Sequence, residues 1–164
     1  MRLAIILILF ILVGLFLTLA TKEKEIYLEP LYARDSDGSD SEDIINSMKE
    51  NYEIVSLKAN PFGYVELIKF EFKGFIKRID AEFYWNIYED FGGGNIYIGY
   101  SFDGKNYIEK GPFNESGSYK IDIPVNIFSN LNNLRLRFRG EDLDFGPDAL
   151  AEVKMKLKVY FLAI

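Results

Sequence analysis

The chain has 164 residues, a formal net charge of −6 and a hydrophobic fraction of 49%. It contains no Cys and no His, which excludes disulfides, thiolate nucleophiles, histidine acid–base catalysis and the usual zinc sites. The first twenty residues are nearly all apolar, so roughly 140 remain, enough for one further domain.

The acidity is concentrated in one segment. Residues 21–53 hold four cations against ten acids, whereas residues 54–164 hold fourteen cations against fifteen acids. Such a nearly neutral domain lacks the basic surface of a nucleic-acid-binding protein, so no nucleic-acid partner is predicted. The absence of Gln and the many Ile, Lys and Glu residues resemble the composition of proteins from thermophilic archaea, although eleven Asn residues argue against such a source.

Leu3 to Ala20 form an apolar run without a charged residue. As a helix this run is about 27 Å long, close to the hydrocarbon thickness of a bilayer, so we predict a transmembrane anchor over residues 1–20. A cleavable signal peptide is the alternative, because small residues at Thr18 and Ala20 precede a candidate cleavage site. The positive charges, Arg2 before the run and Lys22 and Lys24 after it, slightly favour a cytoplasmic domain. The short N-terminal tail favours export of the rest, so we predict a single-pass protein of the cell membrane with an extracellular domain.

Residues 21–43 include Pro30 and an acidic run, RDSDGSDSED, that has no apolar surface to bury. This composition predicts a flexible acidic linker. Ser39 and Glu42 match a capping box, and apolar residues follow at helical spacing, so we expect a short helix over about residues 40–51 with Ser39 as its N-cap.

From residue 52 to 164 the apolar period changes to two, and turn residues recur about every ten positions, a pattern typical of an all-β domain. The expected strands cover residues 54–58, 64–73, 79–88, 95–102, 106–109, 119–123, 134–139 and 151–161. Asp103-Gly104 predicts a hairpin. The fold class is therefore mainly β, an antiparallel β-sandwich preceded by the transmembrane helix, the acidic linker and the short helix.

Two segments carry a resemblance to a known family. The hairpin sequence YSFDGKNY of residues 100–107, the alternating LRLRFRG of residues 134–140 and a closing strand over residues 153–161 resemble the second half of discoidin-like or galactose-binding-like jelly-roll domains. The resemblance implies a jelly-roll sandwich that acts as a glycan-binding or surface-binding module. It identifies no ligand residue in this sequence.

Outward-facing aromatic residues give the candidate binding site. Tyr84, Asn86 and Tyr88 alternate with the core residues of one strand, and Tyr97 and Arg137 are expected to face outward from two others. Tyrosine rings stack on sugar rings, and the amide and guanidinium groups hydrogen-bond to hydroxyls, so these five residues are the predicted glycan site. The alternative is that the tyrosines pack under the helix or a loop.

A second candidate is a calcium site at Asp142, Asp144 and Asp148. Carboxylate oxygens suit calcium, but turn formation at Gly146-Pro147 explains the same acidic run. Structural calcium is the one cofactor considered. No pattern identifies a pair of catalytic carboxylates, so the chain is predicted not to be an enzyme.

The function that these features predict is a membrane-anchored cell-surface module that binds glycan or another envelope component. The alternative is a structural accessory subunit of a membrane or surface-appendage complex, without a small-molecule ligand. An open groove lined by Tyr84 and Tyr88 favours the first function, whereas an unprotected sheet edge favours the second.

Two cationic stripes predict the sheet order. Arg135, Arg137 and Arg139 repeat along one strand, and Lys154, Lys156 and Lys158 repeat along another. Like charges on directly paired strands repel, so we expect these strands not to be paired in register. The strand with outward Asp80 and Glu82 is expected beside at least one stripe.

Overall fold

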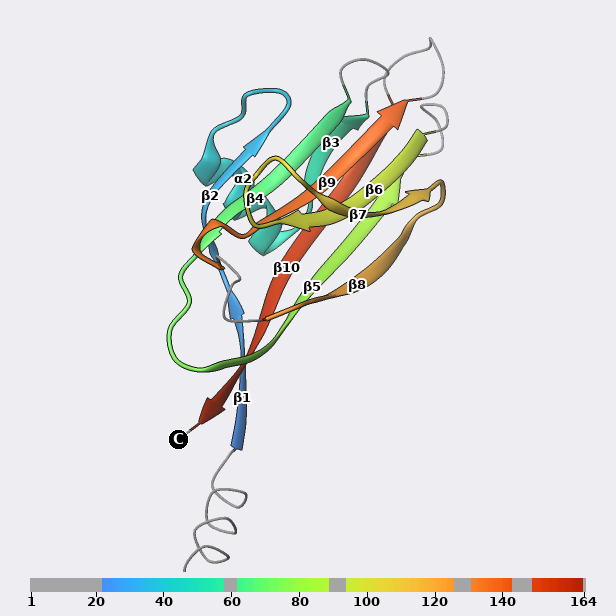
Figure 1. Cartoon of the computed structure of the whole chain (residues 1–164). Coiled ribbons are helices and arrows are strands. Elements are labelled where there is room, and N and C mark those ends of the chain that lie inside the picture. Colours follow the sequence, from blue (N-terminus) through green and yellow to red (C-terminus); the bar gives the residue numbers. More distant parts are fainter. Residues whose placement is uncertain (1–21, 58–61, 89–93, 126–130, 143–148, 164) are drawn as a thin grey trace, which may run out of the picture.

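The computed structural model describes residues 22–57, 62–88, 94–125, 131–142 and 149–163, and their strands form two five-stranded sheets (Figure 1). Sheet A contains β1 (Lys22–Leu28), β3 (Glu53–Leu57), β5 (Ile76–Ile87), β8 (Gly117–Ile123) and β10 (Ala149–Ala163). Sheet B contains β2 (Pro30–Asp35), β4 (Gly63–Phe70), β6 (Gly94–Ser101), β7 (Ile108–Phe113) and β9 (Arg135–Asp142). The helix α2 (Ser41–Glu50) and the short 3-10 helix η2 (Leu131–Asn133) complete the described elements.

The predicted antiparallel two-sheet sandwich is confirmed. Sheet A has the order β1-β10-β5-β8 with β3 also paired to β10, and sheet B has the order β2-β4-β9-β6-β7. Most successive strands cross from one sheet to the other, as in a jelly roll. β6 and β7 stay in one sheet and form the expected hairpin, whose Gly104 has a φ of 71°.

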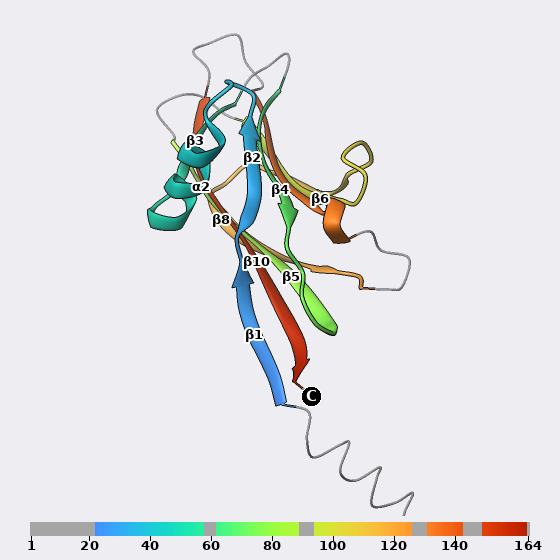
Figure 2. The ribbon, with the colours of Figure 1, turned by 90° about the vertical axis from the view of Figure 1, so that its left-hand side faces the viewer.

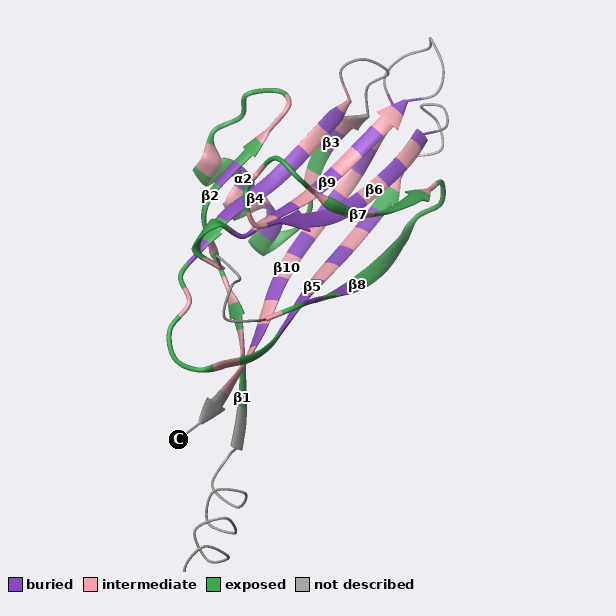
Figure 3. Ribbon diagram, viewed as in Figure 1, coloured by how far each residue is buried: buried purple, intermediate pink, exposed green. Residues whose placement is uncertain are grey.

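The core lies between the sheets, and the period-two pattern of the sequence places it there. In β10 the side chains alternate between buried and partly exposed, and β5 and β9 do the same over most of their length (Figure 3). Phe70, Phe83 and Phe138 are the largest of the fully buried side chains. This alternation gives each sheet one face in the core and one outer face.

The predicted linker is wrong for residues 22–35, because these residues form β1 and β2. β1 pairs with the end of β10 over seven positions, and β2 pairs with β4. β1 lies at the outer edge of a sheet and begins with four charged residues, so its composition resembles that of a linker although the backbone is paired. The sandwich therefore begins at residue 22 and not at residue 52.

The acidic run after β2 is also folded and is not a flexible linker. The carboxylate of Asp35 accepts hydrogen bonds from the backbone N–H groups of Asp37, Gly38 and Ser39, which closes a compact turn after β2. α2 confirms the predicted helix to within one residue at each end. Its N-cap is Asp40 and not Ser39, since the Asp40 carboxylate accepts from the Glu42 N–H at 2.8 Å.

The order of the stripes is confirmed. β5 pairs with β10 and places Glu82 opposite Lys156 and Asp80 opposite Lys158, whereas the arginine stripe lies on β9 in the other sheet. In the described part of the chain no helix is long and apolar enough to cross a membrane. The apolar run from Leu3 to Ala20 lies outside the described residues, so the anchor stays a prediction.

Candidate functional site

The five residues of the predicted glycan site lie on two opposite faces of the sandwich. Tyr84 and Asn86 belong to β5, and Tyr88 follows it, on sheet A. Tyr97 lies on β6 and Arg137 on β9, both in sheet B. The prediction that all five form one site is therefore wrong, because side-chain alternation shows which residues face outward but not which sheet a strand joins.

Tyr97 and Arg137 belong to a cluster in which each charge has a partner. We call it the arginine face, made up of Arg34, Arg135, Arg137 and Arg139 with Glu66, Glu109 and Glu141. Arg137 pairs with Glu109 at 2.9 Å, and its guanidinium carbon lies 3.4 Å from the centre of the Tyr107 ring. The guanidinium carbon of Arg139 lies 4.0 Å from the centre of the Tyr97 ring. These stacked and paired groups form a structural network.

Glu66 is the centre of the arginine face. Its side chain is 2% exposed, and its carboxylate accepts hydrogen bonds from Arg34 at 2.7 Å and from the hydroxyl of Tyr107. A nitrogen of Arg135 lies 3.8 Å away. Burial, followed by the hydrogen bond to Glu66, raises the pKa of Tyr107, so this hydroxyl stays a donor at neutral pH.

The outer face of sheet A differs because some of its cations form no ion pair with any residue whose position the structure describes. We call it the lysine–tyrosine face, made up of Tyr27, Tyr52, Tyr84, Lys154, Lys156 and Lys158. Three of its residues lie on β10, and the tyrosines come from β1, β5 and the residue before β3. Tyr27 is 53% exposed and Tyr52 is 43% exposed, so ring surface is open to solvent.

The three lysines are not equivalent. Lys158 pairs with Glu25 at 2.8 Å, and this hydrogen bond raises the pKa of Lys158. Lys154 and Lys156 form no ion pair with any residue in the described ranges. Their side chains are two positions apart on one strand, about 7 Å, so both ammonium groups can reach one anionic group.

Tyrosine rings flank both of these lysines. The ammonium nitrogen of Lys154 lies 5.6 Å from the centre of the Tyr52 ring. The ammonium nitrogen of Lys156 lies 5.4 Å from the centre of the Tyr27 ring and 5.9 Å from that of the Tyr84 ring. Such contacts orient an ammonium group without neutralising its charge.

Glu82 holds two of the rings. The hydroxyl of Tyr84 lies 3.2 Å and that of Tyr27 lies 3.4 Å from the same carboxylate oxygen of Glu82. Burial raises the pKa of both hydroxyls, and the charge of Glu82 raises it further. The two rings therefore come from opposite sides of β10 and share one anchor, which leaves Lys156 between them.

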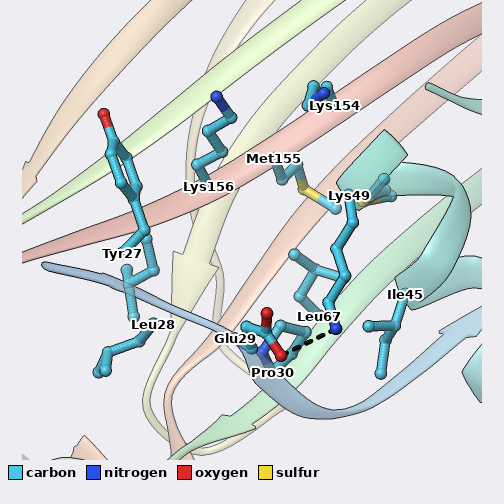
Figure 4. Close-up of a pocket in the computed structure, with 12 residues that line it drawn as sticks. Tyr27, Leu28, Glu29, Pro30, Ile45, Lys49, Leu67, Lys154, Met155 and Lys156 are labelled. Atoms are coloured by element: carbon cyan, nitrogen blue, oxygen red, sulfur yellow. Dashed lines mark ion pairs between the residues drawn. The ribbon is translucent and has the colours of Figure 1, made fainter. Parts of the chain in front are cut away.

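A hollow of about 270 Å³ adjoins the lysine–tyrosine face at the edge of β10. β1 pairs with β10 from Leu157 onward and β3 pairs with it up to Val153, so residues 154–156 have neither strand beside them on this edge. Apolar side chains, among them Met155 and Leu67, line the hollow. Figure 4 shows Tyr27 and Lys156 with their polar ends on the same side of β10, next to this hollow.

Asn86 and Tyr88 are not free for a ligand in the way that the sequence suggests. Asn86 accepts a hydrogen bond from Ser116 at 2.9 Å, and its amide nitrogen lies 3.4 Å from Glu152. A hydrogen bond to Glu152 raises the pKa of Tyr88. These two residues connect β5 to β10 and to the turn before β8, and of the predicted site only Tyr84 belongs to the lysine–tyrosine face.

The predicted calcium site is largely outside the described residues, since Asp144 and Asp148 both lie there. Asp142 is described and buried, and its carboxylate accepts a hydrogen bond from the backbone N–H of Ala149 at 3.0 Å. Among the residues with described positions, no group of three acids is arranged to hold a metal ion. Calcium binding stays a prediction.

No sequence pattern predicted that Tyr27 and Tyr52 lie beside Lys154 and Lys156. Tyr27 fell in the segment interpreted as a linker, and the alternation of Glu25 and Tyr27 with Ile26 and Leu28 was the signal for a strand there. The lysine stripe was recognised as a solvent-facing strand surface. Which strands flank that stripe follows from the sheet order, which no local pattern specifies.

Comparison with known proteins gives structural similarity alone. No family model matches the chain, and no curated protein matches its sequence. Similar solved structures include TmCBM61 in complex with beta-1,4-galactotriose, at 12% identity and a TM-score of 0.40, covering 82% of this chain and 86% of that one. The xylan-binding module CBM15 has 7% identity and a TM-score of 0.44, covering 84% and 97%.

A third similar structure is the enzymatically active domain of bacteriophage CBA120 tailspike protein 4, at 8% identity and a TM-score of 0.41, covering 88% of this chain and 19% of that one. All three TM-scores are below 0.5. The fold assignment therefore rests on the strand order and register of this chain, and so does any inference about its ligand.

Proposed function

We propose that this protein is a membrane-anchored, non-catalytic surface module that binds acidic glycans of the cell envelope on its lysine–tyrosine face. The apolar run from Leu3 to Ala20 is the proposed anchor, with the sandwich outside the cell. The observation that carries the proposal is the pair Lys154 and Lys156, two cations that form no ion pair with a described residue and are flanked by exposed tyrosine rings.

The lysine–tyrosine face offers contacts for both the sugar ring and the acidic group of such a ligand. The C–H face of a sugar ring is apolar and packs against the face of a tyrosine ring, which carries partial negative charge. A carboxylate or sulfate on the sugar pairs with a lysine ammonium group, and a charge-assisted hydrogen bond of this kind is stronger than one between neutral groups. Neutral glycans make the first contact but not the second.

The structural accessory subunit is the weaker alternative. It needs a sheet edge that accepts another strand, and β8 is an edge strand of sheet A. Lys120 and Asp122 place charges along β8, and charged side chains on an edge strand discourage pairing with another chain. The lysine–tyrosine face therefore supports ligand binding better than the edge supports assembly.

The test measures binding of the full-length protein, reconstituted in nanodiscs, to an array of uronate-containing, sulfated and neutral oligosaccharides. We expect signal from acidic oligosaccharides alone. For the strongest of them, Lys154→Ala together with Lys156→Ala should lower the affinity at least about tenfold. Lys158→Ala is the matched control, since Glu25 already neutralises that lysine, and it should change the affinity less than about threefold.

Binding to neutral glycans with equal strength, or no binding to any oligosaccharide on the array, would contradict the proposed ligand. Equal losses in the double variant and in the control would show that general surface charge, and not the unpaired lysines, determines binding. Increasing salt should weaken binding, because the lysines are partly exposed.

A further inference from the structure

The start of β1 determines how closely the sandwich is joined to the proposed anchor. β1 begins at Lys22 and is paired with β10 along its whole length, from Lys22 opposite Ala163 to Leu28 opposite Leu157. In the sequence, Thr21 alone separates Ala20 from this paired strand. One residue spans at most about 3.6 Å, so an anchor that ends at Ala20 leaves no slack between the bilayer and the sandwich.

Figures 1 and 2 show what lies at this end of the molecule. The start of β1, the end of β10 and the loop that leads into β5 lie together there, at the opposite end from β3. The loop is residues 71–75, which follow β4 and contain Gly74 with a φ of 87°. An anchored sandwich therefore presents this loop to the membrane.

The same end carries the most exposed large apolar side chain that the structure describes. Phe75, in this loop, is 66% exposed. It lines a hollow of about 560 Å³ whose other apolar walls include Ile26 and Phe161. Leu31 also lines this hollow, but it lies three residues beyond Leu28 and is therefore far from the start of β1.

Charged residues border this apolar surface. Lys24 and Lys73 line the same hollow together with Glu29 and Glu71, and Lys73, which is 78% exposed, pairs with Glu71 at 3.1 Å. Aromatic and aliphatic side chains next to lysines are typical of a protein surface that lies at the boundary between lipid headgroups and acyl chains. Lysine side chains reach the headgroups while the apolar residues face the acyl chains.

We propose that this end of the sandwich, with Phe75 as its contact residue, rests on the lipid bilayer surface. The proposal depends on the membrane anchoring stated above. β10 ends at the membrane, and Lys156 lies five residues before Phe161, at most about 17 Å further out. The sandwich is thus fixed upright, and its lysine–tyrosine face stands above the lipid headgroups.

The experiment uses the absence of Cys from the chain, which allows labelling at one introduced cysteine. Phe75→Cys carries an environment-sensitive fluorophore in the full-length protein, which is reconstituted in phosphatidylcholine–phosphatidylglycerol vesicles with and without lipids spin-labelled near the headgroup. We expect at least a threefold loss of fluorescence in the spin-labelled vesicles.

Ile54→Cys is the matched control, because Ile54 is also an exposed apolar residue, at 56%. It lies opposite Glu152 on β3, nine positions before Phe161 along β10 and so about 30 Å from the proposed contact. Its fluorescence should not change with the spin-labelled lipids. Circular dichroism of each labelled variant verifies that the sandwich is intact.

Each outcome decides a separate question. If the vesicles float with the protein but the label at position 75 is quenched no more than the label at position 54, the bilayer contact is wrong and the anchor stands. If the protein does not float with the vesicles, the anchor is wrong and the contact proposal is overturned with it. Quenching at position 75 without quenching at position 54 supports the proposal.

Discussion

Each outer face of the sandwich carries a stripe of cations, and the two stripes differ in how many of those cations form ion pairs. On the arginine face, Arg137 and Arg139 share Glu109, and Arg34 and Arg135 share Glu66. On the lysine–tyrosine face, Lys158 alone of its three lysines forms an ion pair in the described part of the chain. Arginines that form ion pairs within the protein stabilise its fold. Lysines that form no ion pair remain available to a ligand.

Sheet architecture explains the difference. β9 has a strand on each side, β4 and β6, and β4 supplies Glu66, while β7 beyond β6 supplies Glu109. β10 has β5 along one side, but β1 and β3 share the other side and leave residues 154–156 without a neighbour. Where β1 is present it supplies Glu25 to Lys158. At the gap no strand supplies such an acid, and Glu82, opposite Lys156 on β5, accepts the hydroxyls of Tyr84 and Tyr27 and forms no ion pair with Lys156 in the described part of the chain.

Among the substitutions that test this difference between the two faces, we expect Glu66→Gln to change the free energy of unfolding most. Glu66→Gln removes a buried carboxylate that serves two arginines and the hydroxyl of Tyr107. We expect the free energy of unfolding to fall by about 2–4 kcal/mol, measured by urea denaturation. Glu82→Gln on the lysine–tyrosine face is the control and should cost less than about 1 kcal/mol.

A loss below about 1 kcal/mol for Glu66→Gln would contradict the structural role of the arginine face. Equal losses in the two variants would remove the distinction between the faces. The comparison is informative because each carboxylate accepts at least one tyrosine hydroxyl, while Glu66 is buried and Glu82 is partly exposed.

A smaller effect is expected when the two stripes themselves are compared. Arg137→Met removes the pair with Glu109 and the stacking on Tyr107, and should lower the free energy of unfolding by about 1–2 kcal/mol. Lys156→Met removes no ion pair with a described residue and should change it by less than about 0.5 kcal/mol. Thermal and urea unfolding of the two variants, done in parallel, test this difference, and the reverse order would show that the lysine stripe is the structural one.

The sequence predicted those parts of the fold that depend on local alternation. The outward Asp80 and Glu82 and the lysines of β10 were correctly placed on neighbouring strands, because charge complementarity across a strand pair limits the possible orders. Tyr97 and Tyr84 were wrongly placed together, since both alternate with core residues but on different sheets. Sheet membership is decided by contacts between distant segments, which a local period does not report.

β1 shows why composition misled the interpretation of residues 21–43. Alternating Lys and Glu residues with few apolar ones are typical of a solvated linker, yet they also suit an edge strand whose pairing with β10 supplies the missing contacts. The gap between β1 and β3, and with it the hollow beside Lys154 and Lys156, follows from this strand. Because β1 was not predicted as a strand, the candidate site beside it was not predicted either.

The smallest expected effect concerns the turn that positions Tyr107 on the arginine face. Asp103 lies in this turn, and its carboxylate accepts from the backbone N–H groups of Lys105 and Asn106, each at 2.8 Å, and from the Asn106 side chain at 2.7 Å. The two backbone hydrogen bonds, followed by that of the Asn106 side chain, lower the pKa of Asp103 well below its ordinary value of 3.8.

Because the folded state holds Asp103 ionised at a pH where the unfolded chain binds a proton, this carboxylate stabilises the fold above about pH 4 and loses that contribution as the pH falls. Asp103→Asn has no such titration. We therefore expect the difference in free energy of unfolding between the natural chain and Asp103→Asn to be constant from pH 7 to pH 5 and to shrink between pH 4 and pH 2.5, measured by urea denaturation at each pH. A difference that stays constant to pH 2.5 would show that the charge of Asp103 does not support the turn, and Tyr107 would then owe its position to Glu66 and Arg137 alone.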